Sequence, residues 1–449
     1  MEGILKMIIN IPEEALFIIK QLNNNGFEAY AVGGCIRDSL LKRKPKDWDI
    51  TTNATPHEVK SLFDKTVDTG IKHGTVTIII NNQIFEVTTY RVDGKYSDNR
   101  RPEKVEFTSS LKDDLSRRDF TMNAIAYHPY EGYIDYFNGI DDITHSLIKT
   151  VGNANERFQE DALRMLRAIR FSAQLNFLID EETIEAIKSN AYYIEKISIE
   201  RIRDEINKIL ISKQAEKLKL LTTFGVSKHL IPDLRLFCTS SQSNPNYIFD
   251  EILQNIDFIS FIENDLLLRW TLLLQQIDKS IIKVDFGNTE NILSPASLES
   301  TQLAKIILQK LRFDNKTINK ITKLIQCLDI EIDPTYNSVR KAVSVIEDHL
   351  FIDLLKLKEA SYKARNIDNL QEKINVLNMI KNMYSDIKEK QQCLSLQELA
   401  INGSDLINLG FKQDKNIGIL LSKLLEIVIE NPKLNNKKTL IQLVKAMDI

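Results

Sequence analysis

The sequence predicts an α+β fold, in which a head with a mixed sheet and helices precedes a long all-helical part. Ten of the 15 glycines occur by Gly152, and only five are spread over the rest of the 449 residues. Glycine-rich turns suit a sheet, whereas glycine-poor segments with apolar residues at a period of about 3.6 suit helices. The apolar pattern turns helical from Ala154 onward, as in the segment ERFQEDALRMLRAIRFSAQL. We therefore expect the sheet to end near residue 150.

Within the head, apolar runs and turn residues predict alternating helices and strands. The expected elements are a helix from about Glu13 to Asn23, a strand over Glu28–Val32, a helix from the Gly33-Gly34 turn to Leu41, a strand over Trp48–Thr52, and two strands, Thr75–Ile80 and Ile84–Tyr90, joined as a hairpin by Asn81-Asn82-Gln83. The highly charged stretch Val92–Leu115 is expected to be a mobile loop.

Composition excludes several classes of protein. The length predicts two to four domains. The net charge of −3 means that any surface for nucleic acid must come from local clusters of Lys and Arg. The four cysteines lie far apart without a CxxC pair, which argues against a structural zinc site or a disulfide framework and favours a cytoplasmic protein. No uninterrupted apolar run reaches the roughly 18 residues of a membrane span, so no membrane association is expected.

Two acidic residues suggest a metal site. Asp47 and Asp49 stand two positions apart in KDWDITT, at the start of the expected strand. Alternation along a strand would put both carboxylates on one face. Two such oxygen ligands can hold Mg²⁺ together with substrate phosphates and water. Two aspartates at this spacing, without a further motif, more often mark a solvated strand end. The prediction of a metal site therefore depends on the segment before them.

That segment, AVGGCIRDSLL, predicts a strand, two glycines and a helix that carries Arg37. Glycine lets the backbone approach a phosphate closely, and a helix N-terminus offers free N–H groups. Arg37 can add a bidentate contact to a triphosphate. A glycine turn followed thirteen residues after Gly34 by the two carboxylates is much more specific than either feature alone.

The chain resembles a known family here. VGGCIRDSLLKRKPKDWDITTNATP, FEVTTYR, DLSRRDFTMNAIAY and EDALRMLRAIRF follow one another over about residues 28–175. Together they are similar to the signature of the class II tRNA nucleotidyltransferases and bacterial poly(A) polymerases, within the polymerase-beta-like nucleotidyltransferase superfamily. The resemblance implies a catalytic head over residues 1–150, a helical neck with a nucleotide-selecting helix over 151–215, a helical body over 216–330 and a helical, tRNA-binding tail over 331–449.

The family's functional residues fall on matching positions of this chain. The resemblance implies that Asp47 and Asp49 are the metal ligands, and that Gly34 and Arg37 contact phosphate. Glu86, in FEVTTYR, would be an extra catalytic carboxylate near the metals, although an outward Glu on a strand is more often solvated. The second motif supplies the residues for sugar and triphosphate contacts, which are Arg117, Arg118, Asp119 and Asn123.

A pair of side chains in EDALRMLR can select the base. Asp161 and Arg164 are three residues apart and would share one face of a helix. Cytosine and adenine both present an amino donor beside a ring-nitrogen acceptor, which an Asp and an Arg complement, whereas uracil and guanine present a carbonyl instead of the amino group. A site built for hydrogen bonding rejects the wrong group strongly. The family is understood to use these two residues in this way. Arg167 and Arg170 extend the basic row and would contact the triphosphate or the primer end.

The predicted reaction is attack of a tRNA 3′-hydroxyl on the α-phosphorus of CTP or ATP with Mg²⁺ as cofactor, which adds C, C and A without a nucleic-acid template and releases pyrophosphate. The alternatives are an enzyme that adds only A and a poly(A) polymerase. Bacterial poly(A) polymerases commonly carry a basic disordered extension, whereas the C-terminal segment here is expected to be helical, which disfavours that alternative. The segment RVDGKYSDNRRPEKVEFTSS, from Arg91 to Ser110, argues against an enzyme that adds only CC, because such members of the family tend to lack a loop there. A catalytically idle RNA-binding protein is the alternative from a different class, and the intact pair of carboxylates argues against it. The chain would act as a monomer or a homodimer.

The C-terminal segment also resembles the family. INGSDLINLGFKQDKNIGILLSKLLEIVIENPKLNNKKTLIQLV is similar to the tail of the Gram-positive-type members, which holds the top of the tRNA. The segment from Gly410 to Gly418 is expected to form a turn between helices and to bring Lys412 and Lys415 near a phosphate. Asp414 stands where the family often has a glycine, which departs from the pattern of a tight phosphate contact.

Overall fold

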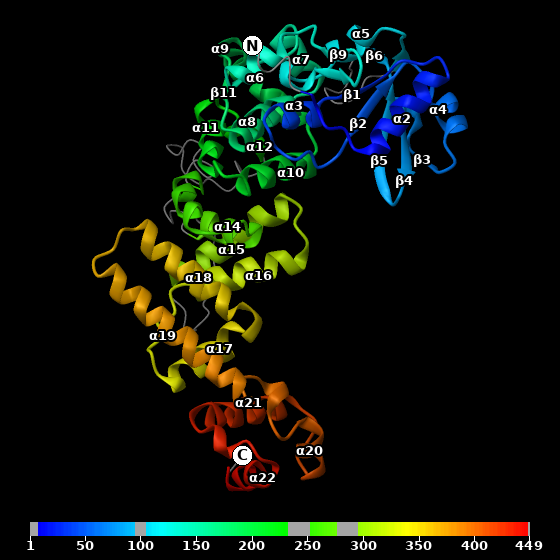
Figure 1. Cartoon of the computed structure of the whole chain (residues 1–449). Helices are drawn as coiled ribbons and strands as arrows, with labels where there is room; N and C mark the ends of the chain where they lie inside the picture. The colour runs from blue at the N-terminus through cyan, green and yellow to red at the C-terminus, as the bar shows by residue number, and fades with distance from the viewer. Residues whose placement is uncertain (1–7, 95–104, 232–251, 276–294, 448–449) are drawn as a thin grey trace. The chain divides into compact units, whose positions relative to one another are not determined.

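The computed structural model describes residues 8–94, 105–231, 252–275 and 295–447. The chain divides into two compact units, Met1–Arg235 and Leu236–Ile449. All strands of the described residues belong to the first unit, and the described part of the second unit contains helices and their connections (Figure 1). The predicted α+β organisation is therefore confirmed.

A seven-stranded mixed sheet forms the centre of the head. Its strands, in spatial order, are β3 (Thr66–Gly70), β4 (Thr75–Ile80), β5 (Gln83–Thr89), β2 (Asp49–Thr52), β1 (Ala29–Val32), β8 (Ala126–His128) and β9 (Gly132–Ile134). β2 and β5 pair in parallel, and the other neighbours in this sheet pair in antiparallel fashion. Every residue of β1 is buried, which fits its position inside the sheet.

Helices cover the sheet and shape its edges. α2 (Glu13–Asn24) and α4 (Pro56–Leu62) pack against each other and against strands of the sheet. α2 does so because Ile18, Ile19 and Leu22 lie on one face at helical spacing and are fully buried. The remaining helices of the head are α3 (Gly34–Leu40), α5 (Leu111–Ser116) and α6 (Gly139–Thr144). Leu111 and Leu115 of α5 join a second apolar cluster with side chains of β1.

The predicted hairpin is confirmed, and the predicted mobile loop is partly wrong. β4 and β5 are joined at Asn81 and Asn82, both at positive φ (51° and 61°), as a tight two-residue hairpin requires. Val92–Leu115 is not simply a loop, because β6 (Arg91–Asp93) pairs with β7 (Val105–Phe107) and α5 begins at Leu111. Residues 95–104 lie outside the described residues. The pairing was missed because each strand has only three residues and the sequence there is polar.

The predicted helix through ERFQEDALRMLRAIRFSAQL is also interrupted. α7 (Ala154–Glu160) ends at Asp161, whose φ of −138° and ψ of 103° are extended, and α8 (Leu163–Leu175) begins two residues later. The Asp161 carboxylate accepts a hydrogen bond from the Leu163 backbone N–H at 3.1 Å, which stabilises the new helix start. The other helices that follow are α9 (Glu181–Asn190), α10 (Ile199–Leu210), α11 (Leu220–Thr223) and α12 (Ser227–Leu230), and two short strands, β10 (Leu147–Ile148) and β11 (Leu178–Ile179), pair beside them.

The second unit is helical throughout its described residues. Its helices are α14 (Leu266–Leu274), α15 (Pro295–Lys310), α16 (Asn315–Cys327), α17 (Tyr336–Ile346), α18 (Asp348–Ala364), α19 (Leu370–Glu389), α20 (Gly403–Asn408), α21 (Lys415–Glu430) and α22 (Lys437–Ala446). One apolar cluster joins α14 and α16 to α19, and another joins α20 to α22. Side chains cap many of these helices at their N-termini, for example Asp314 and Asn436, each of which accepts a backbone N–H.

Two expectations from composition can be compared with the structure. Cys35, Cys327 and Cys393 are buried free thiols, and Cys238 lies outside the described residues. In the described ranges, no helix combines the length and the apolar character that crossing a bilayer requires.

Candidate active site

A polar cavity of about 900 Å³ opens in the first unit, and nearly all of the predicted site residues line it. Its basic residues are Arg37, Arg43, Lys44, Lys46, Arg117, Arg118, Arg164, Arg167, Arg170, Arg201 and Lys208, and its acidic residues are Asp38, Asp47, Asp49, Asp119 and Asp161. The eleven Lys and Arg side chains outnumber the five Asp side chains, so the cavity carries a net positive charge although the net charge of the whole chain is −3. The predicted local cluster of Lys and Arg therefore exists, and it suits a polyanionic ligand.

The two predicted metal ligands lie beside each other, although only one belongs to a strand. β2 begins at Asp49, so the exposed Asp47 precedes the strand, and strand alternation does not explain their proximity. The pKa of Asp49 is raised to about 6, mainly by burial and next by the nearby carboxylate of Asp47, with a smaller contribution from Glu86, while Arg118 acts in the opposite direction. Glu86 is exposed on β5 and does not line the cavity. Its predicted place near the pair agrees with its effect on the pKa of Asp49.

The pair of carboxylates fits a hard divalent cation. Among the described residues, no group of three or more His, Cys, Asp or Glu side chains is arranged to hold a metal ion. Mg²⁺ usually binds through one or two carboxylates and takes its other ligands from water and substrate phosphates. Two crowded oxygen donors, one with a raised pKa, therefore match the donor set of Mg²⁺, because a cation would offset their mutual repulsion.

The glycine turn before α3 brings backbone close to this pair. Gly33 has a φ of 81°, in the left-handed region that favours glycine, and a side chain there would lie 3.0 Å from a guanidinium nitrogen of Arg118. Arg37 of α3 donates from Nη1 to the Asn123 side-chain oxygen at 2.7 Å and from Nε to Asp38 at 2.9 Å. Gly33, Gly34 and Arg37 all line the cavity, as predicted.

Residues of the motif DLSRRDFTMNAIAY line the cavity next to this turn. Asp119 is buried and accepts hydrogen bonds from the Asn123 side chain at 3.0 Å and from Arg167 Nε at 2.7 Å. Burial alone would raise the pKa of Asp119, but Arg167 and Asn123 lower it well below its usual range. Arg118 contacts Asp114 at 3.3 Å, and its Nε is buried without an acceptor in the described part of the chain. Arg118 also lines the cavity, which puts its guanidinium within reach of a ligand there.

Asp161 and Arg164 both line the cavity, but the argument that they share a helical face was wrong. Asp161 lies in the break between α7 and α8 and pairs with Arg201 at 2.9 Å. Arg164 lies in the first turn of α8 and contacts Glu160 at 2.5 Å and the Arg117 carbonyl oxygen at 2.8 Å. The two candidate base-selecting groups are thus held by different partners, each of which fixes one side chain.

Three arginines surround one aromatic ring of α8. The guanidinium carbons of Arg37, Arg167 and Arg170 lie 5.0, 5.4 and 4.2 Å from the centroid of the Phe171 ring. Such contacts stabilise a cation over an aromatic face. Burial, and next the charge of Arg167, lower the pKa of Arg170 to about 10. Phe171 thereby gathers the arginines predicted for the triphosphate or the primer end.

Several residues that line the cavity, or that pair with residues lining it, were not predicted. Arg201 and Glu205 of α10 pair with Asp161 and Arg170, and Glu160 pairs with Arg164. Arg201, Glu205 and Lys208 recur at spacings of four and three in IERIRDEINKIL, which is one polar helical stripe. That stripe was the available signal, but it does not reveal that α10 packs against α8.

Comparison with family models covers most of the chain. Residues 29–149 match the poly A polymerase head domain, and residues 176–238 match the probable RNA and SrmB-binding site of polymerase A. Residues 292–444 match the putative domain 2 of tRNA nucleotidyltransferases. The three matches follow in the order expected for a head, a neck and a helical remainder.

Individual relatives point in the same direction. The chain is 35% identical over 450 residues to the CCA-adding enzyme of Ligilactobacillus salivarius, with 98% of each chain covered. It is 51% identical over 219 residues to the CCA-adding enzyme of Geobacillus thermodenitrificans, over 49% of this chain and 54% of that one. Its fold is similar to the crystal structure of the Bacillus stearothermophilus CCA-adding enzyme in complex with CTP, with a TM-score of 0.73, 28% identity, and 97% and 98% of the two chains covered.

Proposed function

Because this chain belongs to the family of CCA-adding enzymes, we propose that its cavity in the first unit adds C, C and A to the 3′ end of tRNA, from CTP and ATP with release of pyrophosphate. The observation that carries the proposal is the meeting, in one basic cavity, of Asp47 and Asp49, the Gly33-Gly34 turn and the Asp161 and Arg164 side chains. The chain is a nucleotidyltransferase, and the proposal assigns metal binding, triphosphate binding and base selection to individual residues.

Asp47 and Asp49 would hold Mg²⁺. One metal held there would lower the pKa of the RNA 3′-hydroxyl, and a second would neutralise charge on the leaving pyrophosphate. Glu86 would add negative potential beside the pair, since it lies opposite Asp49 in the register of β2 and β5. Arg118 and Arg37, which both line the cavity, would donate to the triphosphate.

Asp161 and Arg164 would read the pairing edge of the incoming base. The carboxylate accepts from the amino group that cytosine and adenine share, and the guanidinium donates to the adjacent ring nitrogen. Arg201 and Glu160 would hold these two groups in place, which limits the freedom that a mismatched base needs for an alternative fit. Asp119 would orient Arg167, and Asn123 would orient Arg37, toward the sugar and the triphosphate. Arg170 would remain beside them through Phe171.

The finer division of the chain follows the same proposal. Residues 1–150 would be the catalytic head, 151–215 the neck, 216–330 the body and 331–449 a tail that holds tRNA. The tail includes α21, where the Asp414 side chain accepts the Asn416 backbone N–H and caps the helix, so its acidic side chain occupies the helix start that the family often leaves open with glycine. Action in the cytoplasm and a monomeric or homodimeric state complete the proposal.

One experiment separates CCA addition from its alternatives. Purified protein receives three tRNA transcripts, which end at the discriminator base, at C and at CC, together with labelled CTP or ATP. CCA addition predicts C on the first two transcripts, A on the third, and a complete CCA end when both nucleotides are present. Addition of A to the CC-ended transcript alone would indicate an enzyme that adds only A. Repeated addition of A to all three would indicate a poly(A) polymerase, and no incorporation would indicate an idle RNA-binding protein.

A further inference from the structure

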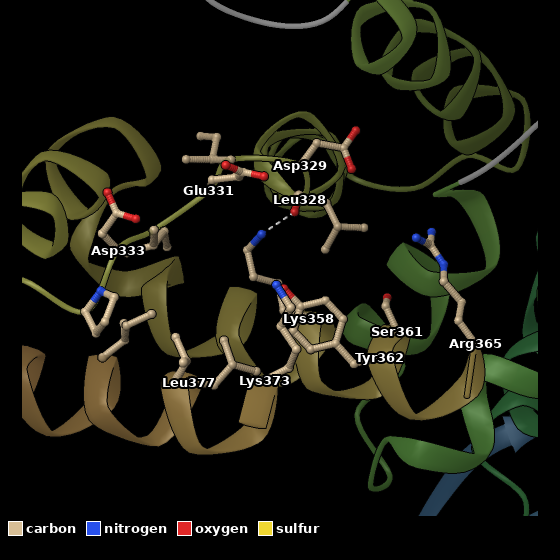
Figure 2. Close-up of a pocket in the computed structure, with 15 residues that line it drawn as sticks. Leu328, Asp329, Glu331, Asp333, Lys358, Ser361, Tyr362, Arg365, Lys373 and Leu377 are labelled. Atoms are coloured by element: carbon tan, nitrogen blue, oxygen red, sulfur yellow. Dashed lines mark hydrogen bonds between the residues drawn. The ribbon is translucent and has the colours of Figure 1, made fainter. Parts of the chain in front are cut away.

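A second cavity, of about 350 Å³, lies entirely within the second unit. It is enclosed by the segment that connects α16 to α17 and by α18 and α19 (Figure 2). Cavities that bind small molecules range from about 300 to 1,000 Å³, so this one has room for a ligand of modest size. Its residues play no part in the reaction proposed above.

Lys358 of α18 reaches into this cavity from its base. The side chain is only 8% exposed, and its ammonium donates to the Leu328 carbonyl oxygen at 2.5 Å (Figure 2). An ammonium has three N–H donors. The described structure supplies this one acceptor, so two donors remain for a ligand. Burial lowers the pKa of Lys358 to about 8, although Asp329 and Glu331 act in the opposite direction.

Two exposed carboxylates line the same cavity as the lysine. Asp329 and Glu331 line the same cavity and act on the charge of Lys358, yet neither forms an ion pair with it in the described part of the chain. A ligand group that bridges the Lys358 ammonium and one of these carboxylates must accept a hydrogen bond from the ammonium and donate one to the carboxylate. A hydroxyl does both, whereas a carboxylate or a phosphate oxygen only accepts.

The rim of the cavity adds groups of a different kind. Tyr362 lines the cavity together with Glu331 and Arg365, and its hydroxyl has a raised pKa because of burial and next Glu331, while Arg365 acts in the opposite direction. Arg365 and Lys373 are exposed cations on α18 and α19. Exposed guanidinium and ammonium groups suit a phosphate, which can keep part of its hydration at a rim.

We propose that this cavity binds a phosphorylated sugar, with its hydroxyls between Lys358 and the carboxylates of Asp329 and Glu331 and its phosphate at Arg365 and Lys373. The sugar phosphate can be free or can carry a base as a mononucleotide. The cavity would thus be a ligand site whose lining residues all belong to the second unit and differ from those of the active site proposed above.

The test measures acetylation of Lys358 in the full chain. Acetic anhydride modifies neutral amines, and mass spectrometry gives the rate at each lysine with and without ligand. Lys356 is the matched control, since it lies on the same helix, is exposed and pairs with Asp353. A non-reducing probe, methyl riboside 5-phosphate, avoids an imine between lysine and an open-chain sugar. We expect the rate at Lys358 to fall roughly tenfold once the probe exceeds its Kd about tenfold, with Lys356 unchanged.

Further ligands separate the sources of the chemistry. Protection by the riboside phosphate and by AMP alike supports a sugar-phosphate site, and protection by AMP alone supports a mononucleotide site. Tyr362→Phe, which removes only a hydroxyl, should weaken either effect. Equal acetylation of Lys358 with and without both ligands would overturn the proposal. Inorganic phosphate that protects as well as the riboside would do the same, because the hydroxyls would then contribute nothing.

Discussion

Asp49 and Glu86 occupy matched positions on the parallel strands β2 and β5. Side chains at matched positions of neighbouring strands point to the same face of a sheet. The sheet therefore brings together two carboxylates that are 37 residues apart in the sequence, and Glu86 raises the pKa of Asp49. Of the two, only Asp49 lines the cavity.

This asymmetry predicts unequal losses of activity. Asp49→Asn keeps the shape of the side chain but removes a metal ligand, and nucleotide incorporation should fall by more than about 100-fold while nucleotide binding largely survives. Glu86→Gln should lower incorporation by only about tenfold, because Glu86 acts through its charge on the metal ligand Asp49 and does not itself line the cavity. Single-turnover incorporation and equilibrium binding of CTP measure the two effects. Full turnover by Asp49→Asn would remove the metal assignment.

The base-selecting role of Arg164 predicts a change in choice of nucleotide. Arg164→Ala should reduce discrimination against UTP and GTP by about 100-fold or more, because the groups that reject them are no longer both present. The measurement is kcat/KM for each of the four nucleotides. Lys208→Ala is the control, since Lys208 lines the same cavity but pairs with Glu205. It should affect all four nucleotides alike, and unchanged selectivity in Arg164→Ala would disprove the role.

Two glycines predict opposite changes in stability. A side chain at Gly139 would overlap the Thr121 carbonyl oxygen, at the start of the turn that carries Asn123. Gly139→Ala should therefore lower the free energy of unfolding by about 1–3 kcal/mol. Gly418 lies exposed within α21 with open space around it, and Gly418→Ala should raise that free energy by roughly 0.5–1 kcal/mol. Urea unfolding monitored in each variant gives both signs, and a neutral Gly139→Ala would contradict the close contact.

The buried lysine of the second unit predicts a dependence of stability on pH. The pKa of Lys358 is about 8 in the folded chain, against its ordinary value of 10.5, so between these values the unfolded chain binds more protons. The free energy of unfolding should therefore rise with pH across this window, by up to about 3 kcal/mol, and stay level in this respect below it. Lys358→Met should remove the rise, and Lys356→Met should keep it. Parallel slopes for the native chain and Lys358→Met would refute the assignment.

Much of the head was predictable because its signals are local. β4 and the helix from Glu13 agree with the expected bounds within one residue, since apolar periodicity and turn residues define them. Asp47, Asp49, Gly34 and Arg37 were predicted as one site from their spacing, and all line one cavity.

The features that were missed arise from contacts between distant segments. The helical pattern of the sequence continues across Asp161 and gives no sign of the break between α7 and α8. At the break, Asp161 pairs with Arg201, which is 40 residues later in the sequence. Likewise, the sequence displays the arginines of α8 but not the position of Phe171 among three guanidiniums, because Arg37 comes from another element. Periodicity describes one helix at a time and does not register such neighbours.

The arginines of the cavity already have acceptors within the protein: Arg37 binds Asp38, Arg167 binds Asp119 and Arg170 binds Glu205. An arriving triphosphate must therefore compete with resident counter-ions, and its net gain is the difference between two sets of charged contacts. The same acids can reclaim their partners when pyrophosphate departs. An exchange of this kind favours rapid release over tight retention, which suits a catalyst that must empty and refill one pocket for each nucleotide it adds.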